Sequence, residues 1–337
     1  MGNNNTRTRS FDVVKNCSDN NRRKMVIAIF VVIALILAAF ATLIIGKLIN
    51  ELPLNPGVPS NGNLNYIPLY AEDIKKGNLL IVNDQFKYDL PTNFSHMVNV
   101  YEYINSSKNS ELTKINGYFT YLSHTPIEDI YVESTTLDAF SKMLLDYCKA
   151  NVNSTTKHGV SNISITWGGY AESTKNEYQG DVSNPNFNGE YYDHGLGTSL
   201  VLRISDTAVV ITEQILKDKY LWIYENAHKY GFIIRYPNAC KDHTGKDSTT
   251  RAHLRYIGVE HATYMYENNI CLEEYIDLLK TKHNSVNTPL SVETENGNYD
   301  IYYIQFNGNH TSVPVPKGAK YTISGDNMNG FIVSVEK

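Results

Sequence analysis

One long apolar segment constrains this chain more than any other feature of its sequence. Residues 25–46 read MVIAIFVVIALILAAFATLIIG, 22 residues without a charged side chain. A helix of that length is roughly 33 Å long and would cross a hydrocarbon core of about 30 Å. A secretory signal peptide is the alternative, but its apolar core is usually only ~7–15 residues long. No small-residue cleavage site closes the segment, so we expect an uncleaved transmembrane helix at residues 25–46.

The charges on either side of this segment predict its orientation. Six cationic residues precede it, whereas Lys47 is the only cation close behind it. Positive charge near a membrane span stays on the cytoplasmic side. We therefore expect a single-pass protein of the cell membrane. Residues 1–24 would form a cytoplasmic tail, and the bulk of the chain would lie outside the cytoplasm.

The charge balance bears on the expected binding partners, and the cysteines bear on the expected disulfide bonds. The formal net charge is −5, and no basic patch alternates with aromatic residues, so nucleic acid is not an expected partner. Cys17 precedes the apolar segment, and Cys148, Cys240 and Cys271 follow it. An odd number outside argues against a full disulfide framework. A Cys240–Cys271 bridge and two buried thiols both remain open interpretations.

The rest of the chain divides by composition. Residues 47–65 are rich in Pro and Gly and predict a semi-rigid linker. Alternating patterns and apolar stripes then mark strands and helices in a main domain at residues 66–283. The predicted strands are residues 77–83, 163–170, 192–204, 231–236 and 252–257. The predicted helices are residues 134–148, 212–229, 259–267 and 272–281. Residues 284–337 predict a small β appendage, with strands at 299–306, 320–324 and 330–335.

Two histidines stand at suggestive places in this pattern. His194 follows directly on a predicted turn, and His253 lies at the start of a predicted strand. Imidazoles at the mouths of adjacent strands can share a zinc ion. Spacing alone supports this interpretation only weakly, because the chain contains ten histidines.

An ordered set of segments gives more specific information. Residues 220–237 read YLWIYENAHKYGFIIRYP, and a Thr-Gly turn, the run HLRYIG at 253–258 and the run LEEY at 272–275 follow in order. Over residues 137–280 the chain resembles the VanY-type D-alanyl-D-alanine carboxypeptidases. The resemblance implies an α+β fold with a small antiparallel sheet packed against helices. It also implies a zinc cofactor, a peptidoglycan stem peptide as the partner, and membrane anchoring.

The resemblance also assigns the metal-site positions. The family binds zinc through a Ser-x-His-x-x-Gly-x-Ala-x-Asp motif and through the His of a Glu-x-Trp-His motif. His194 and His253 match the two histidine ligands. Val201 stands where the Asp ligand belongs, and Thr250 stands where the general-base Glu belongs.

A third motif concerns the substrate. The family's Ser-Gly-Tyr-Arg turn corresponds to residues 168–171, so Tyr170 is kept while Ala171 replaces the substrate-facing Arg. Gln179 keeps the Gln that usually follows this turn. The resemblance therefore implies that Tyr170 and Gln179 are substrate-binding residues.

These replacements affect three independent chemical roles. Zinc hydrolysis needs three protein ligands, an activated water and a base to take its proton. We therefore expect a degenerate carboxypeptidase domain that binds stem peptides or has a regulatory role. The alternative is an active zinc carboxypeptidase in cell-wall remodelling, with replacement ligands from Asp242, His243 or Asp247. Asp193 is expected to point away from His194 if that strand is regular. A structural envelope protein that binds nothing in the cleft is a third hypothesis.

Overall fold

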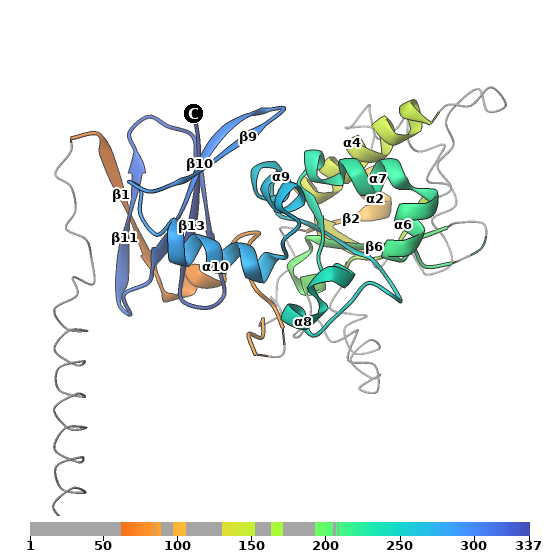
Figure 1. Cartoon of the computed structure of the whole chain (residues 1–337), viewed down its shortest axis with the longest axis horizontal. Helices are drawn as coiled ribbons and strands as arrows, with labels where there is room; N and C mark the ends of the chain where they lie inside the picture. Colours follow the sequence, from red (N-terminus) through yellow and green to blue (C-terminus); the bar gives the residue numbers. More distant parts are fainter. Residues whose placement is uncertain are drawn as a thin grey trace, which may run out of the picture. The chain divides into compact units, whose positions relative to one another are not determined.

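The computed structural model describes residues 62–83, 85–88, 97–105, 130–151, 163–170, 193–204, 207 and 209–337 (Figure 1). Residues 63–337 form one compact unit. The predicted transmembrane segment at 25–46 lies outside the described residues. Among the helices that are described, none is long and apolar enough to cross a membrane.

A four-stranded antiparallel sheet carries both histidines. Its strands, in spatial order, are β4 (Ile163–Trp167), β6 (Ser199–Ile204), β8 (His253–Tyr256) and β7 (Phe232–Ile234). Strand β6 is buried at every residue, because its run of Leu, Val and Ile lies at the centre of the sheet. Helix α4 (Ser134–Ala150) packs Leu137, Phe140 and Leu144 into the same core. The apolar stripe predicted at 134–148 is therefore confirmed as a core face.

The helix predicted at residues 212–229 is broken in the structure. Thr212 caps α6 (Glu213–Lys219) by accepting a hydrogen bond from the Ile215 amide at 3.2 Å. Tyr220 then leaves the helical region with φ −125° and ψ 40°. Helix α7 (Leu221–Asn226) and the 3₁₀ turn η5 (Ala227–Tyr230) follow. The ring of Tyr220 is buried against Tyr147 of α4, so tertiary packing overrides the local helical pattern.

The strand predicted at residues 192–204 begins later than expected. Residues Asp193–Leu196 form a 3₁₀ turn, η4, and β6 starts at Ser199. The Gly197 amide donates a hydrogen bond to the His194 carbonyl at 3.0 Å, and Gly197 has φ +72°. A left-handed residue that only glycine adopts easily ends the turn here. His194 therefore lies on a turn beside the sheet rather than in a strand.

Residues 77–83 were predicted as a strand, and this is wrong. Leu79 and Ile81 are buried, but their amides donate hydrogen bonds to Ser324 Oγ and to the Asp326 carbonyl. Arg255 donates to the carbonyls of Asn78 and Leu80. A buried backbone must satisfy its polar groups. In this segment a side chain and a distant loop satisfy those groups in place of a neighbouring strand.

The second half of the chain follows the predicted order more closely. The helices predicted at 259–267 and 272–281 are α9 (Val259–Asn268) and α10 (Leu272–Lys282). The turn between β7 and β8 contains η6 (Asn238–Cys240) and a one-turn helix, α8 (Lys241–Thr244). A small three-stranded sheet lies earlier in the chain, and α2 (Val100–Asn105) follows its first strand. Its strands are β2 (Met97–Asn99), β3 (Ile130–Glu133) and β5 (Gly169–Tyr170), in that order.

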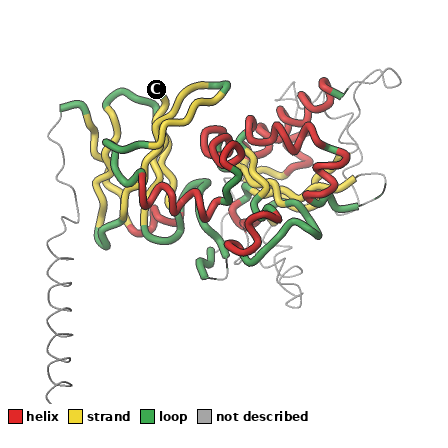
Figure 2. The backbone as a smooth tube through the Cα atoms, viewed as in Figure 1, coloured by secondary structure: helices red, strands yellow, loops and turns green. Residues whose placement is uncertain are grey.

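The C-terminal strands form the predicted β region. The spatial order is β12 (Tyr321–Gly325), β13 (Gly330–Glu336), β10 (Gly297–Gln305) and β9 (Leu290–Thr294). A further strand, β11 (His310–Pro316), pairs with β1 (Leu64–Tyr70), which leads into the 3₁₀ turn η1 (Ala71–Lys75). Figure 2 shows these two strands side by side. The pairing of β1 with β11 was not predicted, because no local pattern connects segments so distant in the sequence.

Candidate active site

The structure brings His194 and His253 together. Their ring centroids lie 4.9 Å apart, with an interplanar angle of 51°. Both side chains are buried. His194 comes from η4, ahead of β6, and His253 is the first residue of the neighbouring strand β8. The two positions that the motif assignment gives to histidine ligands therefore lie side by side in the structure.

Val201 lies directly opposite His253. The two residues are Cα partners across the antiparallel strands β6 and β8. Directly opposed residues place their side chains on the same face of a sheet. Val201 is completely buried. The position predicted for a metal ligand is therefore on the histidine face, and it carries a side chain without a lone pair.

The surroundings keep both imidazoles neutral. Burial lowers the pKa of His194 and lowers that of His253 well below its ordinary value, and their mutual proximity adds to the effect at His253. The ring of Tyr236 packs edge-on against His253, with centroids 5.6 Å apart. Neutral imidazole is the form that binds a metal.

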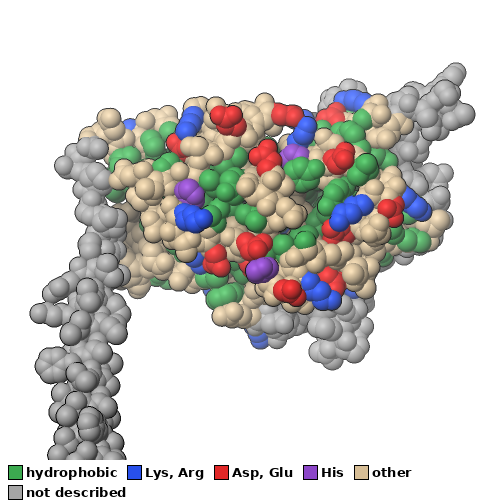
Figure 3. All heavy atoms as spheres, in the orientation of Figure 1, with side chains coloured by type: hydrophobic (Ala, Val, Ile, Leu, Met, Phe, Trp, Pro, Cys, Tyr) green, Lys and Arg blue, Asp and Glu red, His purple; other side chains and the backbone are tan. Residues whose placement is uncertain are grey.

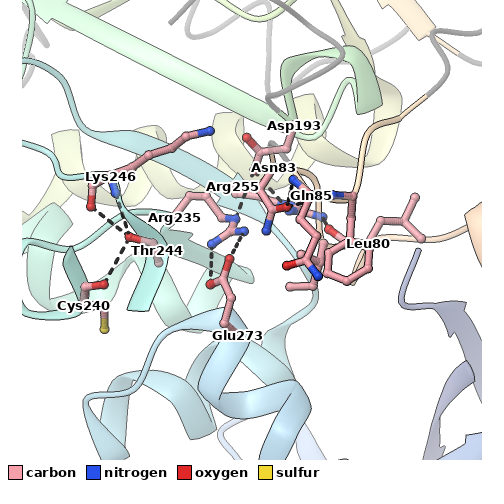
Figure 4. A network of polar contacts seen from close by, with 12 residues as sticks. Leu80, Asn83, Gln85, Asp193, Arg235, Cys240, Thr244, Lys246, Arg255 and Glu273 are labelled. Atoms are coloured by element: carbon pink, nitrogen blue, oxygen red, sulfur yellow. Dashed lines mark hydrogen bonds and ion pairs between the residues drawn. The ribbon is translucent and has the colours of Figure 1, made fainter. Parts of the chain in front are cut away.

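Four charged side chains form a network beside the histidines (Figure 4): Asp193, Arg235 and Arg255 are buried, and Glu273 is partly buried. Arg255 donates from Nη1 to Asp193 Oδ2 at 3.1 Å, and Arg235 Nε lies 3.6 Å from the same oxygen. Arg235 also donates two hydrogen bonds to Glu273, at 2.8 and 2.6 Å. Burial alone would raise the pKa of Asp193, but the two guanidinium groups hold it well below its usual range.

This network was missed at the sequence level. Asp193 was expected to point away from His194 on a regular strand, but it belongs to a 3₁₀ turn and is bound by two arginines. The signal that could have revealed it is an arginine inside each of two apolar runs, GFIIRYP and AHLRYIG. Buried arginines require acidic partners.

A D-alanyl-D-alanine carboxypeptidase of Enterococcus faecium is 34% identical over 266 residues, covering 78% of this chain and 77% of the relative. The chain belongs to the D-alanyl-D-alanine carboxypeptidase family. A second D-alanyl-D-alanine carboxypeptidase, from Enterococcus faecalis, is 44% identical over 61 residues, covering 18% of this chain and 22% of the relative. No family model matches the chain.

A solved structure supports the same fold. The vancomycin resistance D,D-dipeptidase VanXYg, in complex with a D-Ala-D-Ala phosphinate analogue, matches with a TM-score of 0.60 and 20% identity. The match covers 82% of this chain and 100% of that chain. The α+β fold expected from the resemblance, with small antiparallel sheets and helices, is confirmed.

The donor set does not fit the zinc ion that the family implies. Two imidazoles are in place, but Val201 cannot supply the third ligand. Within the described part of the chain, no third His, Cys, Asp or Glu joins His194 and His253 in a metal-binding cluster. Two of the three loop residues proposed as replacements have partners of their own. Asp247 pairs with Lys241 at 2.7 Å, and His243 lies 3.2 Å from Glu274.

The remaining predicted positions are only partly placed. Thr250, at the general-base position, is exposed to solvent, in contrast to the buried histidines. Tyr170 is the last residue of β5 and pairs with Ile130, but its side chain is outside the described atoms. Ala171 and Gln179 also lie outside the described residues. Substrate binding by Tyr170 and Gln179 therefore remains a prediction.

Proposed function

We propose that this chain is a membrane-anchored, extracytoplasmic member of the D-alanyl-D-alanine carboxypeptidase family that has lost hydrolysis and binds peptidoglycan stem peptides. The observation that carries the proposal is the pairing of Val201 with His253 inside the sheet. A position that must coordinate zinc in an active enzyme is filled by a buried valine.

The chemistry of hydrolysis supports inactivity. A zinc-activated water must lose a proton to a nearby base as it attacks the peptide carbonyl. The hydroxyl of Thr250 cannot accept that proton near neutral pH. Ala171 removes the positive charge that would hold a substrate carboxylate. Loss of ligand, base and cation together leaves no route to turnover at the family's rate.

An ion-pair network close to the two histidines supports binding, because it can keep a binding site ordered. Asp193 and Glu273 neutralise Arg255 and Arg235 close to the two histidines. The network keeps the η4 turn and strands β7 and β8 in a defined arrangement. The related VanXYg structure holds a D-Ala-D-Ala phosphinate analogue, and a D-Ala-D-Ala terminus is the ligand class proposed for this chain.

The placement of the protein follows from the apolar segment at 25–46. Its length, together with the cations before it, supports a single span with the cytoplasmic tail at residues 1–24. The domain would then lie outside the membrane, where peptidoglycan stem peptides are found.

One observation favours a second candidate, an active zinc carboxypeptidase with a replacement ligand. The two imidazoles are neutral and face each other at 4.9 Å, which suits metal binding. A third ligand would have to come from outside the described residues.

Two assays on the full-length chain in detergent separate these candidates. The first measures D-alanine release from a stem pentapeptide, with added zinc or with a chelator. The second measures binding of a D-Ala-D-Ala peptide by calorimetry, with an L-Ala-terminated peptide as the control. We expect binding selective for D-Ala-D-Ala without release. Chelator-sensitive release of D-alanine would establish the active enzyme instead.

The binding arm also tests the predicted substrate contact. Tyr170→Ala should weaken binding of the D-Ala-D-Ala peptide by on the order of 10-fold, as for loss of one well-placed contact. Tyr321→Ala is the matched control, because Tyr321 is an exposed tyrosine of β12. Equal binding of both peptides by the unmodified chain would exclude a stem-peptide module and favour a purely structural envelope protein.

A further inference from the structure

A second cluster of metal-ligating side chains lies apart from the histidine pair. Cys240, at the end of η6, meets Cys271 and Glu274 at the start of α10. One ligand atom from each of these residues lies within 4.8 Å of the others. Cys240 Sγ donates a hydrogen bond to Glu274 Oε2 at 3.6 Å. Figure 4 shows Cys240 on the opposite side of Thr244 from the Asp193 network.

We propose that Cys240, Cys271 and Glu274, completed by His243, form a binding site for a thiophilic divalent cation of the zinc class. In tetrahedral zinc sites the bonds to sulfur are about 2.3 Å and those to oxygen or nitrogen about 2.0–2.2 Å, which puts neighbouring ligand atoms roughly 3.3–3.8 Å apart. The separation of 3.6 Å between Cys240 Sγ and Glu274 Oε2 falls in that range.

His243 is the fourth ligand in this proposal, and its exposed ring must turn toward the thiols on binding, because it lies outside the group of three whose ligand atoms are within 4.8 Å of one another. Its Nε2 lies 3.2 Å from Glu274 Oε1. The two thiols are buried, with exposed fractions of 3% for Cys240 and 1% for Cys271. The side chains of His243 and Glu274 are 56% and 32% exposed. The site therefore has a closed sulfur side and an open side through which a hydrated cation enters.

The local electrostatics make binding of the cation depend on pH. Burial raises the pKa of both thiols, so the cation must displace two protons as it binds. Cys271 is the N-cap residue of α10, and its amide donates a hydrogen bond to Glu274 Oε2 at 2.9 Å. A helix N-terminus stabilises a thiolate placed there.

The bound cation would join two segments of the chain, one of which carries Glu273, the partner of Arg235 in the network beside the histidines. It would fasten the η6–α8 turn to α10, whose Glu273 holds Arg235. Metal binding to the folded state should therefore raise the melting temperature.

The test uses cobalt on the full-length chain in detergent, purified with a chelator and a reductant. Cobalt bound by thiolates gives a sulfur-to-metal charge-transfer absorption that histidine and carboxylate ligands do not give. We expect this band at one equivalent, and we expect zinc to remove it. Cys240→Ser and Cys271→Ser should weaken binding on the order of 100-fold or more, since even outer-shell changes cost 10–100-fold.

Controls keep the result specific. Cys148→Ser, a buried thiol of α4, should leave the band unchanged. The double variant His194→Ala, His253→Ala should also retain it, which separates this site from the histidine pair. His243→Ala changes an exposed side chain and should weaken binding without affecting the fold. Three outcomes would overturn the proposal: no charge-transfer band, a band that survives both cysteine substitutions, or a Cys240–Cys271 disulfide in protein prepared without reductant that zinc does not prevent.

Discussion

Val201 and His253 are directly opposed in strands β6 and β8, and this pairing determines what a substitution at position 201 can achieve. A carboxylate at position 201 would lie on the face of the sheet that carries His253. The ring of His194 lies 4.9 Å from the ring of His253, between centroids. The histidine site therefore lacks a third metal ligand at position 201, although the strand register places that position on the correct face of the sheet.

Val201→Asp should create a zinc site and make the fold depend on it. Without metal, the buried carboxylate should destabilise the protein by several kcal/mol. With zinc, a third ligand joins the two imidazoles and the stability should return. Thermal unfolding with and without zinc measures both effects. Leu200→Asp, on the opposite face of the same buried strand, should be destabilised without zinc rescue. Rescue of both variants would contradict the assignment.

Hydrolysis should return only when the chemical roles are restored together. Thr250→Glu alone should release no D-alanine, because a base needs a metal-bound water to deprotonate. The triple variant Val201→Asp, Thr250→Glu, Ala171→Arg is expected to show turnover. D-alanine release from a stem-peptide mimic is the measurement. The triple variant should release D-alanine about 10²–10⁴-fold faster than the same zinc-bound variant with Thr at position 250, because it has the general base. Activity in Thr250→Glu alone would show that a zinc-activated water is already present.

Asp193→Asn should be among the most destabilising substitutions in the chain. It removes the charge that Arg255 and Arg235 share at 3.1 and 3.6 Å, while both guanidinium groups remain buried. Breaking a buried ion pair costs about 3–5 kcal/mol. Lys149→Gln, which breaks the exposed pair with Asp146, should change the unfolding free energy by less than about 1 kcal/mol. Chemical denaturation of the two variants gives the comparison, and equal values would refute the structural role of Asp193.

His228 should make stability fall in mild acid. Burial lowers its pKa to about 4, and its ring stacks on Tyr266 at 4.0 Å, with Lys229 and Glu295 nearby. The unfolded chain binds a proton below pH 6.5, whereas the folded chain binds it only near pH 4. Protonation of His228 therefore does not affect the free energy of unfolding above about pH 6.5. As the pH falls from 6.5 to 4 it lowers the free energy of unfolding, by at most about 3 kcal/mol.

The melting temperature measured between pH 7.5 and 4 tests this expectation. In His228→Gln the melting temperature should fall less between pH 7.5 and 4 than it does in the unmodified chain. Other buried histidines contribute to both proteins, so the difference between the two curves isolates His228. Parallel curves across this range would exclude the proposed protonation.

The orientation of the chain can be tested with reporter fusions after residue 60. An enzyme reporter that works only outside the cytoplasm should be active, and a cytoplasmic reporter should be inactive, because positive charge precedes the apolar segment. Moving the cations is the control. Replacing Arg22, Arg23 and Lys24 by Asn and adding three Lys after residue 47 should weaken or reverse the pattern. A cytoplasmic signal from the unmodified chain would overturn the proposed topology.

The face of the molecule shown in Figure 3 has Lys and Arg side chains interspersed with Asp and Glu side chains. This mixture follows from the composition, which has 30 cationic and 35 acidic residues. Composition could predict such an average property, because it does not depend on which residues meet in the fold.

The sequence by itself determined the elements whose pattern is local. Helices α4, α9 and α10 each carry an apolar stripe at helical spacing, and packing reinforced that pattern. The ordered motifs were sufficient for the family and for the positions of His194 and His253, because those assignments need only residue identity and order.

Only the tertiary structure decided how distant segments meet. It placed Val201 opposite His253 and paired β1 with β11. It also joined the backbone of residues 77–83 by hydrogen bonds to Arg255 and to the Asp326 carbonyl. It also joined Cys240 to Glu274 across 34 residues. Each of these contacts closes a long loop and depends on strand register and on the pairing of buried charge. Such properties arise from the simultaneous packing of many segments, and no single stretch of sequence carries them.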